Sequence, residues 1–364
     1  MSKFSQNFLK SIDKILGKFL VKICRKTKRF QKRVPQEIKE KYTVLIIRPG
    51  GLGDAVLLTP MVMLIREKLK DKVQIHYLGE KRNVEGAKFC YGDMIERFFV
   101  YDSLSFLLFL FRNIKKYDFV LDTEQSFLLP AFFANILGKK VIGFAGTEKE
   151  HVFDIKVEYF FSRFEAVNFF RLGLALILTI EQKDFDEKEH WGISDEDVIS
   201  YFRLSKKYVQ KKSSVAQLEG GQKKRIDVLF APYTTRKEKM CLSLFEIIEE
   251  MRQKGYKIEV VGDRKLMFQD ILKMMEESRV FVSVDNGILH FSNFVDGLKV
   301  VALFGPTNHL KWAPPNAFVL RKYLWCSPCS KYAQIPPCPR NIECMKIEKS
   351  ELKKVILSFL QDVS

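Results

Sequence analysis

The chain has 364 residues, 47% of them hydrophobic and 29% charged. At roughly 150 residues per domain this length predicts about two domains, and the composition excludes a wholly disordered or collagen-like chain. Lysine and arginine number 61 against 44 aspartate and glutamate residues, and this net charge of +17 favours nucleic acid, acidic lipid, phosphorylated sugars or nucleotides as partners.

Much of the charge lies in residues 1–41, which hold thirteen basic and three acidic residues. Apolar side chains recur here at helical spacing, with lysines on the opposite side. The apolar positions are Phe8, Ile12, Ile15, Phe19 and Ile23, with Leu9, Leu16 and Leu20 beside them. Such a basic amphipathic helix is typical of a membrane-surface segment; a helix docked on the protein itself is the alternative. No apolar run approaches the roughly 20 residues of a spanning helix.

Residues 42–180 alternate between strand and helix patterns. We expect strands at 43–47, 73–78, 97–100, 119–122 and 140–144. We expect helices at 55–70 (interrupted at Pro60), 84–90, 106–114 (as a buried helix), 126–137 and 167–178. The alternation predicts βαβ units around a parallel sheet, and hence a first Rossmann-like domain.

A glycine-rich turn, residues 48–54, directly follows the first of these strands. Its glycines allow the backbone to approach a ligand, and the helix start behind it offers free N–H groups to an anion. Asp54 lies at that helix start, where it is either a general base or an N-cap, and taken alone the residue type favours the cap. No Gly-Lys-Ser/Thr follows, so the turn is not a P-loop.

A polar region, 181–225, is predicted to link the first domain to a second, with a helix at 195–212. The second alternation has strands at 226–231, 257–261, 280–284 and 299–304, and helices at 239–253, 267–277 and briefly after Asn286. It predicts a second Rossmann-like domain over 226–348, followed by a C-terminal helix within 349–364. In open α/β sheets ligands bind at the carboxyl ends of the strands, where the turns lie.

Hydroxyls and cations follow the strand at 226–231. This turn runs from Thr234 and Thr235 to Lys239. Such groups at the mouth of a strand fit a phosphate pocket, and a capped helix start with solvated charges is the alternative.

A polar turn, Asp285-Asn286-Gly287, follows the strand at 280–284, and His290 lies one helical turn further on. The backbone amides at this turn could receive a diphosphate. Alone, a histidine at such a position is more often a satisfied core residue.

Four of the seven cysteines fall within nineteen residues: Cys326, Cys329, Cys338 and Cys344. One CxxC pair plus two further thiols could form a structural zinc site. Thiols kept reduced in a cytoplasm are the alternative.

Taken together, these motifs resemble those of the heptosyltransferases of glycosyltransferase family 9, which build the inner core of lipopolysaccharide. The matching segments are 44–54 with Thr59 and Pro60, 117–122 with Gly138 and 142–144, 234–239, 285–287 with His290, 301–307 with Trp312, and Cys344 with Met345. They extend over nearly everything except the basic arm.

The resemblance implies a GT-B fold, with two Rossmann-like domains facing across a cleft, inversion at the sugar's anomeric carbon and no catalytic metal. It implies that Asp54 is the general base and that Lys239 is the cation facing the donor diphosphate. The residues it assigns to the donor are Thr234, Thr235, Asp285, Asn286, Gly287 and His290. Those it assigns to the acceptor-side glycine loop are Arg48, Gly50, Gly51 and Gly53.

Two positions depart from the family pattern. Asn286 replaces the usual Thr or Ser of the Asp-x-Gly turn. The stretch from Gly262 to Met267 is short where family members have an extra helix and strand that carry an acidic, nucleotide-contacting residue; Asp263 is a candidate substitute.

We therefore predict an inverting glycosyltransferase that moves a heptose or similar sugar from an ADP-sugar to an anionic, lipopolysaccharide-core-type glycolipid, with no required cofactor. We expect it in the cytoplasm, on the inner face of the inner membrane. The alternatives are a non-catalytic nucleotide-sugar-binding homologue and a nucleic-acid-binding protein, the latter suggested only by net charge.

Overall fold

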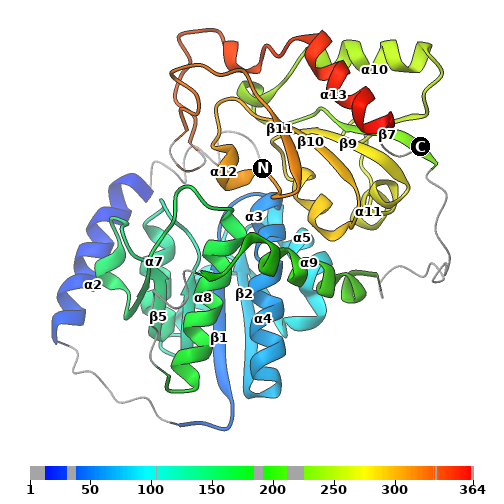
Figure 1. The fold of residues 1–364 in the computed structure, drawn as a ribbon. Coiled ribbons are helices and arrows are strands. Elements are labelled where there is room, and N and C mark those ends of the chain that lie inside the picture. Colours follow the sequence, from blue (N-terminus) through cyan, green and yellow to red (C-terminus); the bar gives the residue numbers. More distant parts are fainter. Residues whose placement is uncertain are drawn as a thin grey trace. The chain divides into compact units, whose positions relative to one another are not determined.

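The computed structural model describes residues 13–30, 38–103, 105–183, 192–210, 225–330, 332 and 334–361. The chain divides into two compact units, the first made of residues 1–160 and 166–194 and the second of residues 161–165 and 195–364. Each unit contains one parallel β-sheet with helices packed against it (Figure 1). The prediction of two parallel α/β halves is therefore confirmed.

The first sheet has six parallel strands in the order β3-β2-β1-β4-β5-β6. They are β1 (Tyr42–Arg48), β2 (Val73–Gly79), β3 (Arg97–Val100), β4 (Tyr117–Asp122), β5 (Gly138–Phe144) and β6 (Ile155–Val157). The helices between and after them are α3 (Leu52–Leu57), α4 (Thr59–Leu69), α5 (Lys81–Tyr91), α6 (Phe106–Arg112), α7 (Leu129–Leu137) and α8 (Glu165–Ile180). Because β1 is central and its neighbours β2 and β4 are parallel to it, the chain leaves all three strands at one edge of the sheet.

The interruption expected at Pro60 is confirmed. The helix ends at Leu57 and a new one starts at Thr59, with Pro60 in its first turn. Proline has no N–H to donate, so it fits a first turn but not a helix interior.

Helix α6 corrects one prediction. The apolar run at 106–114 was expected to form a buried helix, but only Phe106 of α6 is buried. Phe106 packs edge-on against Phe133 of α7, with the ring centroids 4.9 Å apart. A helix of seven residues presents one narrow face to its neighbour, so Leu107, Leu108 and Phe111 remain exposed.

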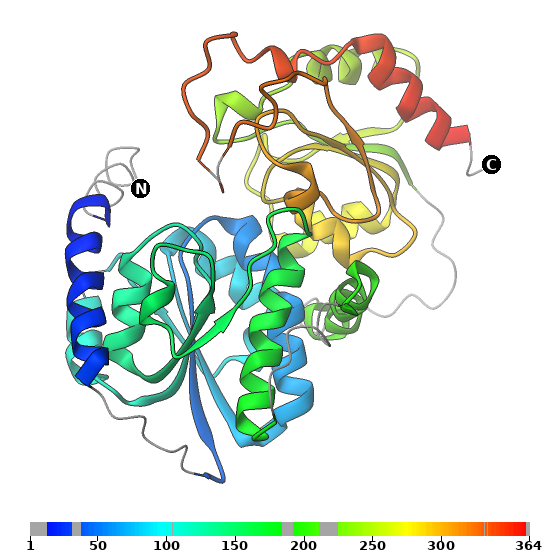
Figure 2. The ribbon, with the colours of Figure 1, turned by 60° about the vertical axis from the view of Figure 1, so that its left-hand side comes forward.

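The described part of the basic arm packs on the first unit. A short π-helix (Asp13–Gly17) leads into α2 (Lys18–Phe30), which lies along the outside of this unit (Figure 2). Val21 and Cys24 are buried in a cluster with side chains of α7. The carboxylate of Asp13 accepts hydrogen bonds from the first amides of α7, with distances of 2.9 Å to Leu128 N and 2.7 Å to Leu129 N.

The arm is therefore part of the first unit rather than a separate domain. Over these residues the helix is docked on the protein itself, and its binding to a membrane surface stays a prediction. Phe8, Leu9 and Ile12 of the predicted apolar stripe lie outside the described residues. No helix within the described residues is long and apolar enough to cross a membrane.

The second sheet has five parallel strands in the order β11-β10-β9-β7-β8. They are β7 (Ile226–Ala231), β8 (Ile258–Val260), β9 (Ser278–Val284), β10 (Lys299–Leu303) and β11 (Ala317–Leu320). Its helices are α9 (Asp195–Gln210), η6 (Lys237–Lys239), α10 (Ser243–Gln253), α11 (Phe268–Glu276), η7 (Leu289–Phe294), α12 (His309–Trp312), η8 (Glu343–Met345) and α13 (Lys349–Gln361).

Two boundaries differ from those expected. The helix predicted from residue 239 begins at Ser243, because Lys237–Lys239 form a separate 3-10 turn. Helix α9, within the predicted linker, belongs to the second unit, where Phe202 packs edge-on against Phe294. The predicted C-terminal helix, α13, packs with α10 in that unit's apolar core.

Candidate active site

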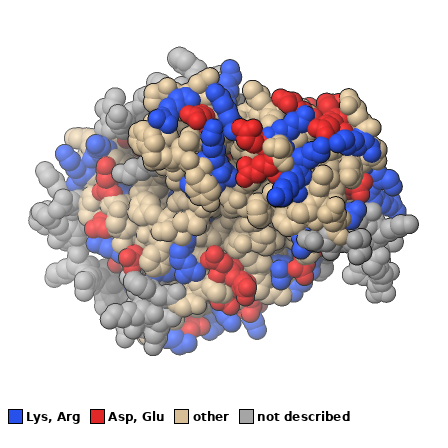
Figure 3. All heavy atoms as spheres, turned by 45° about the horizontal axis from the view of Figure 1, so that its top comes forward, with Lys and Arg blue, Asp and Glu red and all other residues tan. Residues whose placement is uncertain are grey.

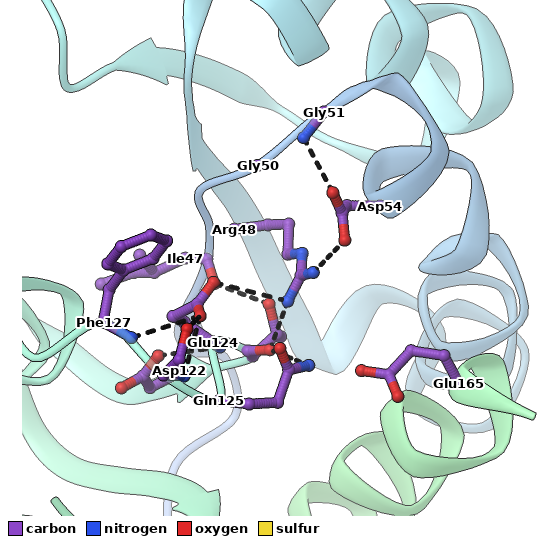
Figure 4. Close-up of polar contacts among 12 residues, drawn as sticks. Ile47, Arg48, Gly50, Gly51, Asp54, Asp122, Glu124, Gln125, Phe127 and Glu165 are labelled. Atoms are coloured by element: carbon purple, nitrogen blue, oxygen red, sulfur yellow. Dashed lines mark hydrogen bonds and ion pairs between the residues drawn. The ribbon is translucent and has the colours of Figure 1, made fainter. Parts of the chain in front are cut away.

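The glycine turn joins the end of β1 to the start of α3, and its backbone requires glycine at one position. Gly50 has a φ of +124°, and a Cβ there would lie 2.6 Å from Oδ2 of Asp54. Asp54 is the third residue of α3, and its Oδ2 accepts a 2.8 Å hydrogen bond from the N–H of Gly51, the N-cap residue (Figure 4). Asp54 is therefore not the N-cap, as its residue type alone suggested. It is the third helical residue, and its carboxylate bonds back to the amide of the N-cap, as in a capping box.

Arg48 holds the other oxygen of Asp54. Its guanidinium forms an ion pair with Oδ1 of Asp54 and donates a 2.6 Å hydrogen bond to the carbonyl oxygen of Thr123 (Figure 4). Glu124 lies 3.9 Å from the same guanidinium, and the ring of Phe169 lies beneath it at 4.8 Å. Because Arg48 ends β1 and Thr123 follows the parallel neighbour β4, the two meet at the carboxyl edge of the sheet.

This environment keeps Asp54 ionised. Burial would raise the pKa of its carboxyl, but the Arg48 guanidinium and the Gly51 N–H favour the charged form and hold the pKa below its ordinary value. The Arg48 side chain is only 3% exposed, whereas 20% of the Asp54 side chain is exposed. A carboxylate has about four lone-pair sites, so the partly exposed, ionised Asp54 can accept a further hydrogen bond from a ligand.

Glu80 and Asn83, which the motif analysis missed, hold the glycine turn from the neighbouring strand. Oε1 of Glu80 accepts a 3.1 Å hydrogen bond from the N–H of Gly50 and a 2.6 Å bond from the hydroxyl of Tyr101. Asn83 Nδ2 donates to the carbonyl oxygen of Arg48 at 3.0 Å. Their position, directly after the β2 strand that neighbours β1, was the available signal.

In the second unit the structure brings together Lys239, Asp285 and Thr307. The Nζ of Lys239 lies 2.7 Å from Oδ2 of Asp285, and the Thr307 hydroxyl donates a 2.5 Å hydrogen bond to the same oxygen. Burial would raise the pKa of Asp285, but the Lys239 ammonium and the Thr307 hydroxyl hold it below the ordinary value. Asp285 is therefore an anion that orients Lys239, whose ammonium keeps further N–H donors for a ligand.

Asn286 has a structural role in this unit. Its side-chain amide donates 3.1 Å hydrogen bonds to the carbonyl oxygens of Ala231 and Tyr233, and its Oδ1 accepts a 2.9 Å bond from Leu289 N. It therefore ties the turn after β9 to the loop after β7. These bonds occupy the Asn286 side chain; the backbone amides of the turn, which the sequence analysis offers to a diphosphate, are different groups.

The remaining predicted donor residues are placed as follows. The Thr234 hydroxyl accepts a hydrogen bond from Arg236 N at 3.2 Å, Thr235 is exposed, and Gly287 is half-buried. His290 is buried in η7, and its ring centroid lies 6.4 Å from that of Trp312. Between β8 and α11 the chain passes through residues 261–267 without a further helix or strand.

The four C-terminal cysteines line one cavity of about 110 Å³. Burial raises the pKa of the Cys329 thiol, and raises that of the Cys344 thiol to about 11. Among the described residues, no three His, Cys, Asp or Glu side chains are arranged to hold a metal ion. The donor set suits zinc although its arrangement here does not, so structural zinc stays a prediction that metal analysis of the purified protein tests.

The fold and these strand-end clusters define the class of protein: two parallel-sheet α/β domains similar to those of GT-B heptosyltransferases. A family 9 glycosyltransferase from Veillonella parvula aligns with a TM-score of 0.57 at 16% identity, over 90% of this chain and 99% of that one. E. coli heptosyltransferase WaaC with ADP aligns with a TM-score of 0.55 at 14% identity, over 87% of this chain and 99% of that one. E. coli ADP-heptose lipopolysaccharide heptosyltransferase II aligns with a TM-score of 0.53 at 13% identity, over 88% of this chain and 100% of that one.

The family model described as glycosyltransferase family 9 (heptosyltransferase) matches residues 263–338, which include the Asp285 turn and three of the four clustered cysteines. No curated protein matches the chain. The match and the structural neighbours confirm the resemblance to family 9 that the motifs predict.

Proposed function

We propose that the protein is an inverting glycosyltransferase that transfers a heptose or similar sugar from an ADP-sugar to an anionic, lipopolysaccharide-core-type glycolipid. The observation that carries this proposal is the ionised Asp54 at the carboxyl edge of the first sheet. The Lys239–Asp285–Thr307 cluster of the second unit supports it. The ADP in the WaaC structure supports an adenine nucleotide as the donor's leaving group.

In the proposed reaction Asp54 acts on the acceptor. Its carboxylate takes the proton of the acceptor hydroxyl while that oxygen forms a bond to the anomeric carbon of the donor sugar. The bond from that carbon to the diphosphate oxygen breaks on the opposite face, which inverts the centre and releases the nucleoside diphosphate. Arg48 and the Gly51 N–H hold the carboxylate ionised and fixed for this transfer.

Lys239 acts on the donor. Its ammonium, oriented by Asp285, would neutralise the negative charge that gathers on the departing diphosphate. Thr234 and Thr235 would contact the phosphates through their hydroxyls. In this proposal a fixed cation and hydroxyls stabilise the leaving group, so the reaction uses no metal ion.

The proposed acceptor determines where in the cell the enzyme would work. A lipid-linked, anionic acceptor requires the enzyme to work at a membrane surface, which we propose is the cytoplasmic face of the inner membrane.

A panel of nucleotide-sugars tests the donor. We expect ADP-heptose to raise the melting temperature and to be consumed when a lipopolysaccharide-core acceptor is added, whereas UDP- and GDP-sugars do neither. A donor-dependent shift without any transfer would favour a non-catalytic nucleotide-sugar-binding protein.

Binding to duplex DNA with a steep salt dependence would instead favour a nucleic-acid-binding protein. On the face shown in Figure 3, basic and acidic side chains are interspersed. This mixture does not resemble the continuous basic surface that such binding uses.

A further inference from the structure

Two helices of the first unit turn large apolar side chains to the outside. On α2 these are Phe19 and Ile23, which are 63% and 41% exposed, together with Leu16 just before the helix. On α6 they are Leu107, Leu108 and Phe111, of which Phe111 is 74% exposed, and Ile114 follows the helix. Single exposed apolar residues are ordinary in proteins. Seven on or next to two helices of one unit indicate a surface that binds a partner.

The two helices belong to one side of the unit. Val21 and Cys24 of α2 and Phe106 of α6 lie in a single buried cluster with α7 side chains. Each helix thus packs on the unit through buried apolar residues, and its exposed residues include further apolar side chains. We call the exposed residues of both helices, listed above, the α2–α6 surface.

The charges on this surface are all positive. Lys18 and Lys22 of α2, Arg112 of α6 and Lys116 beyond it are exposed. Across residues 13–30 and 105–116 the single acidic residue is Asp13, which is buried against α7. Exposed apolar side chains interleaved with cations, and without an exposed anion on either helix, match an anionic lipid bilayer, because acyl chains take the apolar groups and phosphates take the cations.

We infer that the α2–α6 surface is the membrane-docking face of this protein and that its partner is a bilayer of anionic phospholipid. The inference rests on the proposed function only for the role of docking, which is to bring Asp54 to a lipid-linked acceptor. It assigns docking to two helices held rigidly on the first unit, rather than to a basic arm separate from it. Residues on α6, remote in sequence from the basic segment, then bind lipid as much as those on α2.

Vesicle co-sedimentation of the full-length protein tests the inference, without donor or acceptor, on vesicles of phosphatidylglycerol with phosphatidylcholine and of phosphatidylcholine alone. We expect binding to the anionic vesicles only. The double variants Phe19→Ser/Ile23→Ser and Leu107→Ser/Phe111→Ser should each weaken it by about tenfold or more, because each loses two side chains that enter the bilayer.

A matched control is Leu242→Ser/Met267→Ser, which removes two apolar side chains of the second unit that are 70% and 62% exposed. It should bind vesicles like the wild type. All variants should keep the wild-type melting temperature, because the replaced side chains are exposed.

Three results would overturn the inference: no binding of the wild type to anionic vesicles, equal binding of the α6 variant and the wild type, or equal loss in the control. Self-association of the wild type that the α6 variant abolishes, with vesicle binding unchanged, would assign the surface to a second copy of the chain. Because the assay needs no turnover, failure of the proposed transfer reaction would leave its result intact.

Discussion

Replacing Arg48 with methionine tests the electrostatic design around Asp54. Methionine keeps much of the side-chain volume but removes the guanidinium that pairs with Asp54 and donates to the Thr123 carbonyl. Removing one partner of a buried ion pair costs about 3–5 kcal/mol. Because 20% of the Asp54 side chain is exposed and solvent screens the charges, we expect losing this ion pair to lower the free energy of unfolding by about 2–3 kcal/mol. The lost hydrogen bond to Thr123 adds about 1 kcal/mol.

The loss should depend on pH in a defined direction. In the wild type the pKa of Asp54 lies below its ordinary value, so the carboxylate contributes stability at neutral pH that is lost as the pH falls through that lowered pKa. In Arg48→Met burial dominates and the pKa rises. Once the pH is low enough to protonate Asp54 in both proteins, the difference shrinks to the hydrogen-bond part, about 1 kcal/mol.

Urea unfolding of both proteins at neutral pH and at a series of acidic pH values measures this difference, and the series must extend below the lowered pKa of wild-type Asp54. Arg66→Met is the matched control, because Arg66 also joins a carboxylate (Glu96) to backbone carbonyls, but in a more exposed pair. A difference between wild type and Arg48→Met that is as large in acid as at neutral pH would refute the role given to Arg48.

Three further predictions follow from the same contacts. Gly50→Ala should lower stability by about 1–3 kcal/mol and abolish transfer, because alanine is strained at this φ and its Cβ collides with the Asp54 carboxylate; an unchanged urea midpoint would contradict this. Thr307→Val should lower kcat/KM for the donor about fivefold, because Asp285 loses a hydrogen bond worth about 1 kcal/mol; steady-state kinetics with the wild-type kcat/KM for the donor would argue against it. Asp13→Ala should lower the free energy of unfolding by about 2 kcal/mol, because the first amides of α7 lose their cap; calorimetry showing the wild-type melting temperature would contradict this prediction.

The parallel sheets were predictable because each long strand carries a continuous apolar run followed by a helical pattern. For this reason the predicted bounds of β1 and β9 agree with the observed ones to within about two residues. The three-residue strand β6 and the four-residue β11 were missed. Both are short and become strands by pairing with a neighbour, although β3 and β8, which are equally short, were predicted.

Long-range contacts explain the other differences. Asp13 caps a helix that begins 116 residues later, and no local pattern reports such a partner. The apolar sequence of α6 indicates a helix but does not say how much of its surface a neighbour covers. Lys239 and Asp285 were both singled out from strand-end turns, and the parallel sheet explains why they meet.

The structure brings together the predicted residues within each unit, but it changes how some of them act. Arg48, expected as part of an acceptor loop, holds Asp54 in an ion pair, and the Asn286 side chain links two loops. Side-chain roles of this kind depend on which backbone groups lie within reach, and the sequence does not give those distances.

The rate of sugar transfer by Asp54→Asn tests the central claim most directly. Asparagine keeps the shape and can still accept the Gly51 hydrogen bond, but it cannot take a proton from the acceptor. With saturating ADP-heptose and acceptor, we predict a single-turnover rate about 10²- to 10⁴-fold below that of the wild type, with an unchanged donor-induced melting shift. A variant that transfers sugar within a few-fold of the wild-type rate would show that Asp54 is only a helix cap.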